Sequence, residues 1–180
     1  TMIIVTADHG EALGEHGLLG HKVNLYDTLI HVPLLIRYPG AERGSDRHGG
    51  QVQTVDIVPT VLDVAGVGYP VGEYTPQGES LMSAGAPTRS FSIAEQAEPR
   101  FDMFEDRFPF FDPTPFARQL EAIRTDKWKF IWASDDRHEL FDLEKDPGEH
   151  VNLYHDRTDV GRDLEQRLFE SLPPLQRLYR

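Results

Sequence analysis

The sequence predicts an α/β fold in which part of a parallel sheet is followed by a small antiparallel sheet with a helix. Two short runs, 2–6 and 32–38, carry apolar residues on both faces, as buried parallel strands do. Three later segments alternate between apolar and polar residues and are joined by polar turns, which indicates an antiparallel meander. These segments are 120–125, 128–133 and 139–143.

Two helices accompany the predicted strands. The first begins at Asp56, carries Pro59 in its first turn and ends at Gly66, which are typical features of helix boundaries. The second covers 159–172, where apolar residues recur at helical spacing along one stripe. The stripe consists of Val160, Leu164, Leu168 and Leu172.

Changes in composition divide the chain into three parts. Residues 1–70 hold the predicted parallel-sheet elements, 71–89 form a linker rich in Gly and Pro, and 90–180 form a C-terminal antiparallel α+β region. Residues 101–116 contain six phenylalanines without a helical or strand period. We interpret them as a loop held on the core by its aromatic side chains, with a lid over the substrate as the alternative.

Charge and composition argue against several classes of function. The formal net charge is −12, from 30 acidic and 18 basic residues, which argues against nucleic-acid binding. No apolar run approaches the ~18–20 residues that span a bilayer, so no membrane partner is expected. The absence of cysteine excludes disulfides, thiolate nucleophiles and cysteine-based zinc sites. If the substrate is an anion, a metal or local positive groups must offset the acidic background.

A polar, glycine-rich stretch follows the first predicted strand directly. In open parallel sheets, ligands bind beyond the carboxyl ends of the strands, which places Asp8 and His9 where chemistry is usually done. Gly10 allows the chain to turn so that both side chains can face one cation. An isolated Asp-His pair is more typical of a capped turn, but this pair belongs to a larger cluster. The cluster consists of Asp8, His9, Glu11, Glu15, His16, His21 and Lys22.

Four blocks of sequence, in family order, resemble the sulfatase family of the alkaline phosphatase superfamily. The blocks are TADHGE at 6–11 with GEHGLLGH at 14–21 and VPLLI at 32–36, HGG at 48–50 with VDIVPTVLDVAG at 55–66, IRTDKWKF at 123–130, and ELFDLEKDPGE at 139–149 with NL at 152–153. Together they span nearly the whole chain. The resemblance implies that residues 1–70 are the C-terminal part of an alkaline-phosphatase-like catalytic sheet domain.

The resemblance also implies hydrolysis of a sulfate ester with a divalent metal. It assigns Asp8 and His9 as metal ligands, and a basic residue after the glycine-rich stretch as the contact to the sulfate or the leaving oxygen. Many members have a lysine where this chain has His21, and here Lys22 follows one residue later. We favour His21 by position, with Lys22 as an outer contact. Calcium is the metal the family usually uses, whereas manganese or zinc would suit the imidazole of His9 better.

The family's nucleophile, a formylglycine, is expected outside this chain. It is made from Cys or Ser within the motif Cys/Ser-x-Pro-x-Arg, and the single x-Pro-x-Arg in this sequence, at 86–89, has Gly85 at the nucleophile position. The chain also opens at Thr1 within an apolar run, which is typical of a fragment. We therefore expect the C-terminal part of an enzyme, inactive alone, that associates with its missing N-terminal half or with a second copy as a homo-oligomer.

The expected substrate is a small-molecule or carbohydrate sulfate ester. One alternative is a phosphonate monoester or phosphodiester hydrolase of the same superfamily, and the other is a non-catalytic fragment that acts as a folding or association module. Within the polar stretch, Glu15 and His16 are expected to brace the loop through hydrogen bonds. Tyr26 and Asp27 are expected to pack structurally rather than to line the active site.

Overall fold

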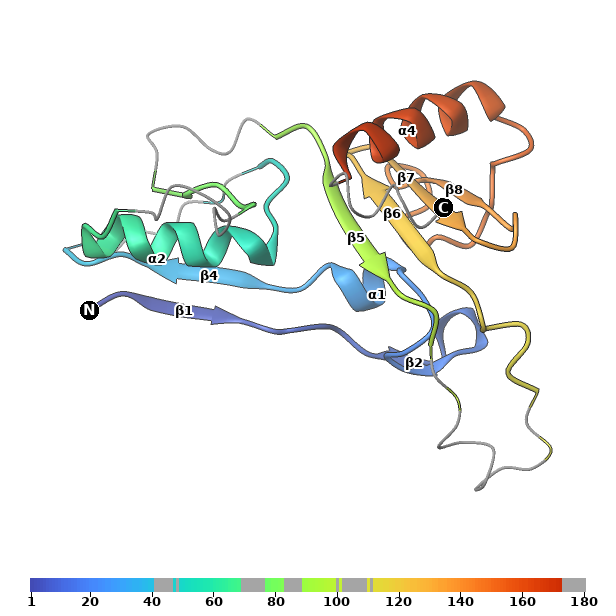
Figure 1. The fold of residues 1–180 in the computed structure, drawn as a ribbon, viewed down its shortest axis with the longest axis horizontal. Helices are drawn as coiled ribbons and strands as arrows, with labels where there is room; N and C mark the ends of the chain where they lie inside the picture. The colour runs from blue at the N-terminus through green and yellow to red at the C-terminus, as the bar shows by residue number, and fades with distance from the viewer. Residues whose placement is uncertain are drawn as a thin grey trace. The chain divides into compact units, whose positions relative to one another are not determined.

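The computed structural model describes residues 1–40, 47, 49–68, 77–82, 89–99, 101, 110 and 112–172. Its contacts group the chain into two compact units, each built from two segments (Figure 1). The first unit comprises Thr1–Asp8 and Val32–Ser92, and the second comprises His9–His31 and Ile93–Arg180.

The polar stretch packs with the C-terminal region, from which it is distant in sequence. Segment 9–31 belongs to the same unit as the C-terminal sheet, whereas the sequence-based division placed it with 1–70. The division into 1–70, 71–89 and 90–180 stays a prediction of where independently folding domains begin and end. Most of the predicted linker and of the phenylalanine-rich segment lies outside the described residues.

A two-stranded sheet and one helix form the first unit. β1 (Ile3–Thr6) pairs with β4 (Leu34–Arg37), with Ile3 opposite Arg37 and Thr6 opposite Leu34. Both runs are strands as predicted, but they pair antiparallel, so the prediction of parallel pairing is wrong for these two strands. A continuous apolar run indicates burial and does not encode strand direction, which is why the sequence pattern could not settle it.

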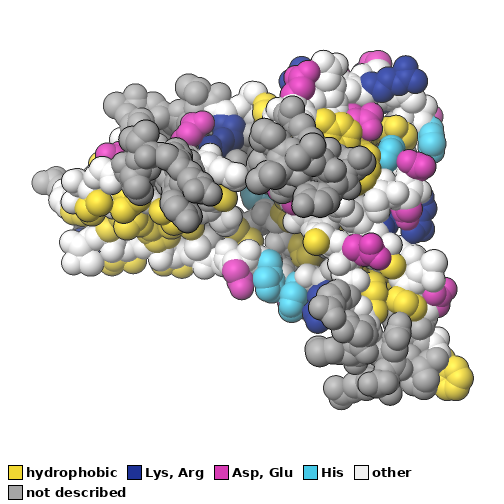
Figure 2. Space-filling model, in the orientation of Figure 1, with side chains coloured by type: hydrophobic (Ala, Val, Ile, Leu, Met, Phe, Trp, Pro, Cys, Tyr) yellow, Lys and Arg dark blue, Asp and Glu magenta, His cyan; other side chains and the backbone are white. Residues whose placement is uncertain are grey.

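Apolar side chains of this sheet are exposed in the described part of the chain. Ile3, Val5 and Leu35 are 45%, 56% and 60% exposed. Figure 2 shows hydrophobic side chains gathered over the region of β1, β4 and the neighbouring helix. The described residues therefore leave these side chains only partly covered, and the burial of both runs stays a prediction for the complete protein.

α2 (Ile57–Ala65) follows a 3-10 turn at Thr54–Asp56 and ends at Gly66, whose φ of 67° is left-handed. The predicted helix and its end are thus confirmed. Asp56 is fully buried at the start of this helix and accepts two hydrogen bonds from Arg89, of 2.6 and 2.9 Å. Burial alone would raise the pKa of Asp56, but Arg89 and the backbone N–H groups of Glu79 and Gln53 together outweigh burial and hold that pKa below its usual value.

A four-stranded sheet in the order β5-β6-β7-β8 forms the centre of the second unit. β6, β7 and β8 pair antiparallel, and Phe130 lies opposite both Ile123 and Leu140. The predicted meander is confirmed to within one residue at each strand end. The strands are β5 (Ser92–Gln96), β6 (Leu120–Arg124), β7 (Trp128–Ala133) and β8 (Glu139–Asp142).

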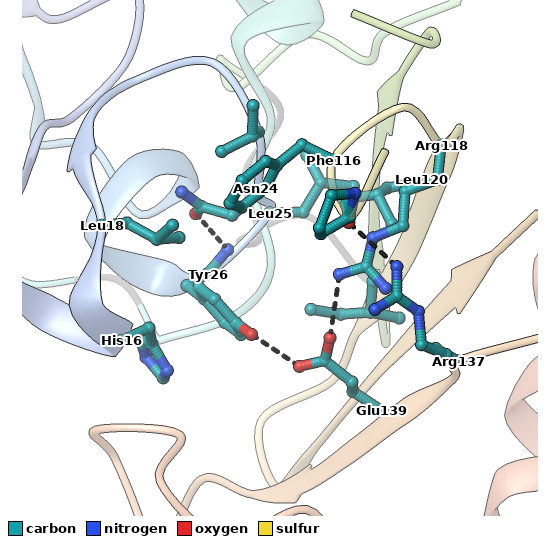
Figure 3. Close-up of a pocket in the computed structure, with 13 residues that line it drawn as sticks. His16, Leu18, Asn24, Leu25, Tyr26, Phe116, Arg118, Leu120, Arg137 and Glu139 are labelled. Carbon is teal, nitrogen blue, oxygen red and sulfur yellow. Dashed lines mark hydrogen bonds and ion pairs between the residues drawn. The ribbon is translucent and has the colours of Figure 1, made fainter. Parts of the chain in front are cut away.

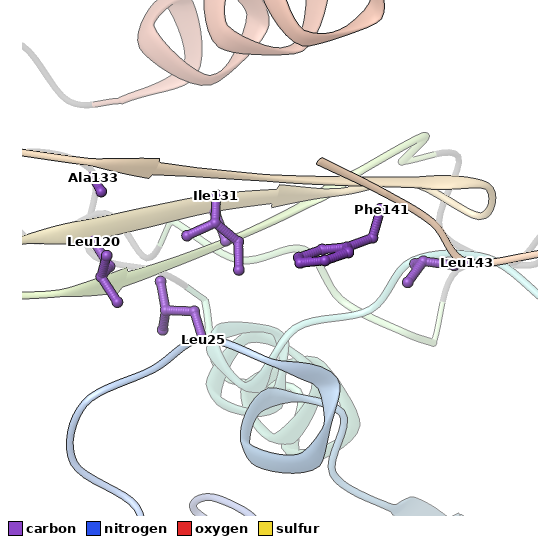
Figure 4. Close-up of a cluster of buried hydrophobic side chains, with 7 residues drawn as sticks. Leu25, Leu120, Ile131, Ala133, Phe141 and Leu143 are labelled. Carbon is purple, nitrogen blue, oxygen red and sulfur yellow. The ribbon is translucent and has the colours of Figure 1, made fainter. Parts of the chain in front are cut away.

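The two faces of this sheet are covered by different parts of the chain. α4 (Thr158–Ser171), the predicted C-terminal helix, lies on one face with Leu164 and Leu168 buried (Figures 1 and 4). On the other face Leu25, from segment 9–31, packs into a buried cluster with side chains of the sheet (Figure 4). The cluster consists of Leu25, Leu120, Ala122, Ile131, Ala133, Phe141 and Leu143.

No described helix has the length and the hydropathy that crossing a membrane requires.

Segment 9–31 contains a small hairpin and one short helix. β2 (Ala12–Leu13) pairs antiparallel with β3 (Leu19–Gly20) around a 3-10 turn at Glu15–Gly17. α1 (Asp27–Ile30) follows and presents Asp27 to the C-terminal sheet. α1 is thus one of the connections between the hairpin and the sheet.

A buried ion cluster joins α1 to the sheet. The ammonium of Lys129, fully buried on β7, lies 2.9 Å from Oδ1 of Asp27 and 2.7 Å from Oε1 of Glu149. The Arg124 guanidinium donates further hydrogen bonds to Asp27, the shortest of 2.9 Å. Oε2 of Glu149 accepts a hydrogen bond of 2.6 Å from the backbone N–H of Asp27. These charged groups thus hold β7, α1 and the turn after β8 together.

The two carboxylates of this cluster have pKa values shifted in opposite directions. Burial would raise the pKa of Asp27, but hydrogen bonds from Arg124 and Lys129 outweigh burial and lower it. Burial dominates at Glu149, so its pKa is raised although Lys129 acts to lower it. Lys129 is therefore the group that keeps Glu149 from being a buried, unpaired charge.

We predict that Lys129→Met lowers the free energy of unfolding by about 3 kcal/mol at neutral pH, because it leaves two buried carboxylates without their shared cation. The loss should be smaller in acid. The pKa of Glu149 is higher in the folded state than in the unfolded state, so the ionisation of Glu149 lowers the free energy of unfolding as the pH rises. In acid Glu149 is protonated in both states, and this loss disappears. Chemical denaturation at two pH values measures both effects. Lys127→Met, which removes a partly exposed lysine paired with Glu144, is the matched control and should cost less than about 1 kcal/mol.

Candidate active site

Three side chains of the polar cluster meet at the base of the β2–β3 hairpin. Ala12 lies opposite Gly20 in the hairpin register, so the next pair outward is Glu11 and His21. Nδ1 of His21 lies 2.9 Å from Oε2 of Glu11. The rings of His9 and His21 stack with their centroids 4.1 Å apart. Hairpin pairing therefore brings together residues that are 12 positions apart in sequence.

The position of Gly10 is fixed by a close approach to α1. Its backbone N–H donates a hydrogen bond of 2.7 Å to the carbonyl of Leu29, and a Cβ at this position would lie 2.0 Å from the carbonyl oxygen of Thr28. Gly10 is not among the described glycines with positive φ. The sequence argument gave it a role in turning the chain, whereas in the structure it lets two backbones approach each other.

Glu15 braces the hairpin through a hydrogen bond, as predicted, whereas His16 does so through ring stacking rather than the predicted hydrogen bond. Oε2 of Glu15 accepts a hydrogen bond of 2.6 Å from the backbone N–H of Leu13. Backbone N–H groups of Glu15 and Leu13 hold the pKa of the Glu15 carboxyl below its usual value. His16 adopts a left-handed conformation with a φ of 54°, and its ring stacks on Tyr26 at 3.7 Å. This contact joins the hairpin tip to the segment before α1.

The predicted site residues differ in how the structure places them. His9 and His21 lie together with Glu11. The sequence analysis included Glu11 in the polar cluster but predicted no role for it. Lys22 is exposed next to His21. Asp8 is also exposed and is the last residue of its segment in the first unit, whereas His9 begins the second unit. The assignment of Asp8 and His9 as metal ligands, and of His21 or Lys22 as the sulfate contact, stays a prediction.

Among the described residues, His9, Glu11 and His21 form a group with the composition of a metal site. Each offers one ligand atom, and these atoms lie within 4.8 Å of one another. Two imidazoles and one carboxylate suit zinc or manganese, whereas calcium prefers oxygen ligands. This trio therefore does not fit calcium. The pair Asp8 and His9 offers one oxygen and one nitrogen donor, which fits a divalent cation that takes its other ligands from elsewhere.

A pocket of about 200 Å³ lies between segment 9–31 and the C-terminal sheet (Figure 3). The Tyr26 hydroxyl donates a hydrogen bond of 2.7 Å to Glu139, whose other oxygen lies 3.5 Å from Arg118. Burial and the neighbouring Glu139 carboxylate raise the pKa of Tyr26. The pocket is lined by His16, Leu18, Val23, Asn24, Leu25, Tyr26, Pro115, Phe116, Arg118, Leu120, Ile131, Arg137 and Glu139.

Sequence reasoning missed this pocket because its walls are distant in sequence. Tyr26 and Glu139 are 113 positions apart, and no local pattern marks either residue as a neighbour of the other. Tyr26 therefore lines a pocket in addition to packing. Asp27, by contrast, is part of the buried ion cluster, so its predicted structural role is confirmed.

Residues 14–176 match the model of a protein family described as N-sulphoglucosamine sulphohydrolase, C-terminal. The chain belongs to this sulfatase family. The match covers β3, the ion cluster and the C-terminal sheet, and it begins after β2 and after Asp8, His9 and Glu11. The predicted family membership is therefore confirmed.

Individual sulfatases and related hydrolases agree with this assignment. Arylsulfatase K from Bos taurus is 33% identical over 172 residues, which are 93% of this chain and 30% of that protein. The solved structure of BT4656 in complex with its substrate D-glucosamine-2-N,6-O-disulfate is 29% identical with a TM-score of 0.68, over 94% of this chain and 33% of that one. Phosphonate monoester hydrolase of Agrobacterium radiobacter is 29% identical with a TM-score of 0.71, over 94% of this chain and 34% of that one.

These comparisons confirm the predicted fold class of a sulfatase C-terminal region, with a mixed α/β composition. This chain spans about a third of the length of the sulfatases that it matches.

Proposed function

We propose that this chain is the C-terminal part of a metal-dependent enzyme that hydrolyses sulfate esters. The observation that carries this proposal is the match of residues 14–176 to a sulfatase family. It is supported by the gathering of His9, Glu11 and His21 at an exposed hairpin base, where a substrate can reach them. The relatives are about three times longer than this chain, so the activity belongs to the complete enzyme.

The proposed substrate is a carbohydrate sulfate ester. BT4656, which aligns with 94% of this chain, binds D-glucosamine-2-N,6-O-disulfate as its substrate. A small-molecule sulfate ester is the alternative. Because the net charge of the chain is −12, an anionic substrate needs a local positive group or a metal to offset the background.

Asp8 and His9 are proposed as ligands of a divalent cation in the complete enzyme. Calcium is the first candidate, with manganese or zinc as alternatives that suit the imidazole of His9 better. A bound cation would offset the charge of the sulfate oxygens as the ester bond breaks. Both side chains are exposed at the end of β1, which leaves them accessible to such an ion.

His21 is proposed to contact the oxygen that leaves with the alcohol. Glu11 lies 2.9 Å from Nδ1 of His21, which orients the ring and directs Nε2 away from the carboxylate. A histidine held in this way can donate a proton to the leaving oxygen near neutral pH. Lys22 is exposed and is proposed as an outer contact to the anion.

The nucleophile is proposed to be a formylglycine on an N-terminal part of the enzyme. No residue of this chain lies in the motif from which it is made, so the chain alone should be inactive. The exposed apolar side chains Ile3, Val5 and Leu35 support the need for a covering partner. We propose that the N-terminal part covers them, with a second copy of this chain as the alternative.

A phosphonate monoester or phosphodiester hydrolase remains the second candidate function. The observation that favours it is the similarity to phosphonate monoester hydrolase of Agrobacterium radiobacter, with a TM-score of 0.71. A complete enzyme that hydrolyses phosphonate monoesters faster than aryl sulfates would establish this alternative. A chain that associates but never supports turnover would be a non-catalytic folding or association module.

We predict that Asp8→Asn in the complete enzyme lowers metal occupancy and sulfatase activity together, because the amide removes the charged oxygen donor. The substitution preserves shape, so the unfolding midpoint should not change. Elemental analysis and turnover of an aryl sulfate measure the two quantities. Asp136→Asn, at another exposed aspartate, is the control, and full activity with full metal content in Asp8→Asn would refute the ligand assignment.

We predict that His21→Ala slows hydrolysis of an alkyl sulfate by about 10²–10⁴-fold, the usual contribution of a general acid. An activated aryl sulfate should be affected less, because its leaving oxygen needs little protonation. Lys22→Ala should slow both substrates by a similar and smaller factor. A larger loss with Lys22→Ala than with His21→Ala on the alkyl sulfate would transfer the leaving-group role to Lys22.

A further inference from the structure

We propose that His9, Glu11 and His21 form a transition-metal site that is best suited to zinc. This site differs from the proposed catalytic cation site, but the two have His9 as a common ligand. The three ligand atoms lie within 4.8 Å of one another and all belong to one compact unit. Two imidazoles with one carboxylate are a ligand set that zinc uses in proteins, with water in the fourth position. Calcium would not select this set, because it prefers oxygen donors.

The donors are near enough to hold one ion once the stacked rings of His9 and His21 tilt toward it. Ligands of a tetrahedral zinc ion lie 2.0–2.2 Å from the metal and hence about 3.3 Å from one another. Nδ1 of His21 and Oε2 of Glu11 are already 2.9 Å apart. The His21 and Glu11 side chains are 42% and 45% exposed, so they can adjust their separation without repacking a core.

Hydrogen bonds define the proton positions that zinc would meet. Nδ1 of His9 lies 2.7 Å from the carbonyl oxygen of Gly10, which places the N–H on Nδ1 and the lone pair on Nε2. On His21, Nδ1 now donates to Glu11, and zinc between these two atoms would take the place of that proton. The imidazole of His21 then carries its single N–H on Nε2, so it stays neutral and no net proton is lost.

The hairpin itself preorganises the site. The pairing of Ala12 with Gly20 sets Glu11 opposite His21, so both side chains lie on the same face. The hydrogen bond from Gly10 to Leu29 fixes the backbone between His9 and Glu11. Because the backbone is already held, the ion does not have to order the loop in order to bind.

The site has a consequence for catalysis that rests on the proposed function. If His9 binds the catalytic cation and His21 contacts the leaving oxygen, a zinc ion on His9, Glu11 and His21 removes both groups from the reaction. Zinc should then inhibit the complete enzyme, and excess calcium should relieve the inhibition because the two ions compete for His9.

The test is a metal titration of the complete, calcium-free enzyme, with Zn²⁺ followed by calorimetry and Co²⁺ followed by its visible absorption. We expect Glu11→Gln and His21→Ala each to weaken Zn²⁺ binding by about 10-fold or more, and to remove the strong absorption of four-coordinate Co²⁺. Asp8→Asn should change Zn²⁺ affinity by less than about 2-fold, because Asp8 is not a ligand of this site. His155→Ala, at an exposed histidine outside the cluster, is the matched control and should also leave it unchanged.

Three results would overturn the proposal. Loss of Zn²⁺ binding in Asp8→Asn with unchanged binding in His21→Ala would place zinc in the Asp8 and His9 site instead. Equal loss in His155→Ala would indicate general binding by exposed histidines. Unchanged binding in Glu11→Gln and His21→Ala would mean that the trio holds no metal. The Co²⁺ spectrum does not require turnover, so these results are distinct from a failure of the sulfatase assignment.

Discussion

The buried ammonium of Lys129 is the contact on which the candidate site depends. It lies between the carboxylates of Asp27 and Glu149, which come from segments more than 100 residues apart. Removing each of these charges from water costs several kcal/mol, and their mutual attraction offsets that cost only when the geometry is good. The Arg124 guanidinium and the backbone N–H of Asp27 supply the additional hydrogen bonds. The cluster therefore fixes where α1 sits on the sheet.

From α1, the positional constraint passes to the hairpin through the close contact of Gly10 with Leu29. The carbonyl of Leu29, on α1, accepts the hydrogen bond from Gly10, and Gly10 lies between His9 and Glu11. Stacking of His16 on Tyr26 gives a second connection nearer the hairpin tip. The side chains of His9, Glu11 and His21 are thus positioned through contacts with a sheet that carries none of them.

Local patterns in the sequence predicted most elements of this fold. Alternation between Trp128 and Ala133 defined β7, and Asp56 and Gly66 defined the ends of α2, because these signals depend on neighbouring residues alone. The direction of β1 was mispredicted, since it depends on which strand lies beside it. The functions of Lys129 and Glu139 were not predictable, because their partners Asp27 and Tyr26 are distant in sequence. His9 and His21 were found through the motif, but the pairing of His21 with Glu11 required the hairpin register.

Hydrogen exchange of the amide of Gly10 in Lys129→Met tests most directly whether the ion cluster holds the candidate site. The measurement should be made where the amides of β6 and β7 remain protected, so that the sheet is still folded. We expect the Gly10 amide and the amides of α1 to exchange faster in Lys129→Met than in the wild type or in Lys127→Met, because the hairpin opens when α1 leaves the sheet. Unchanged protection of Gly10 in Lys129→Met would show that the hairpin is held independently and would contradict this account.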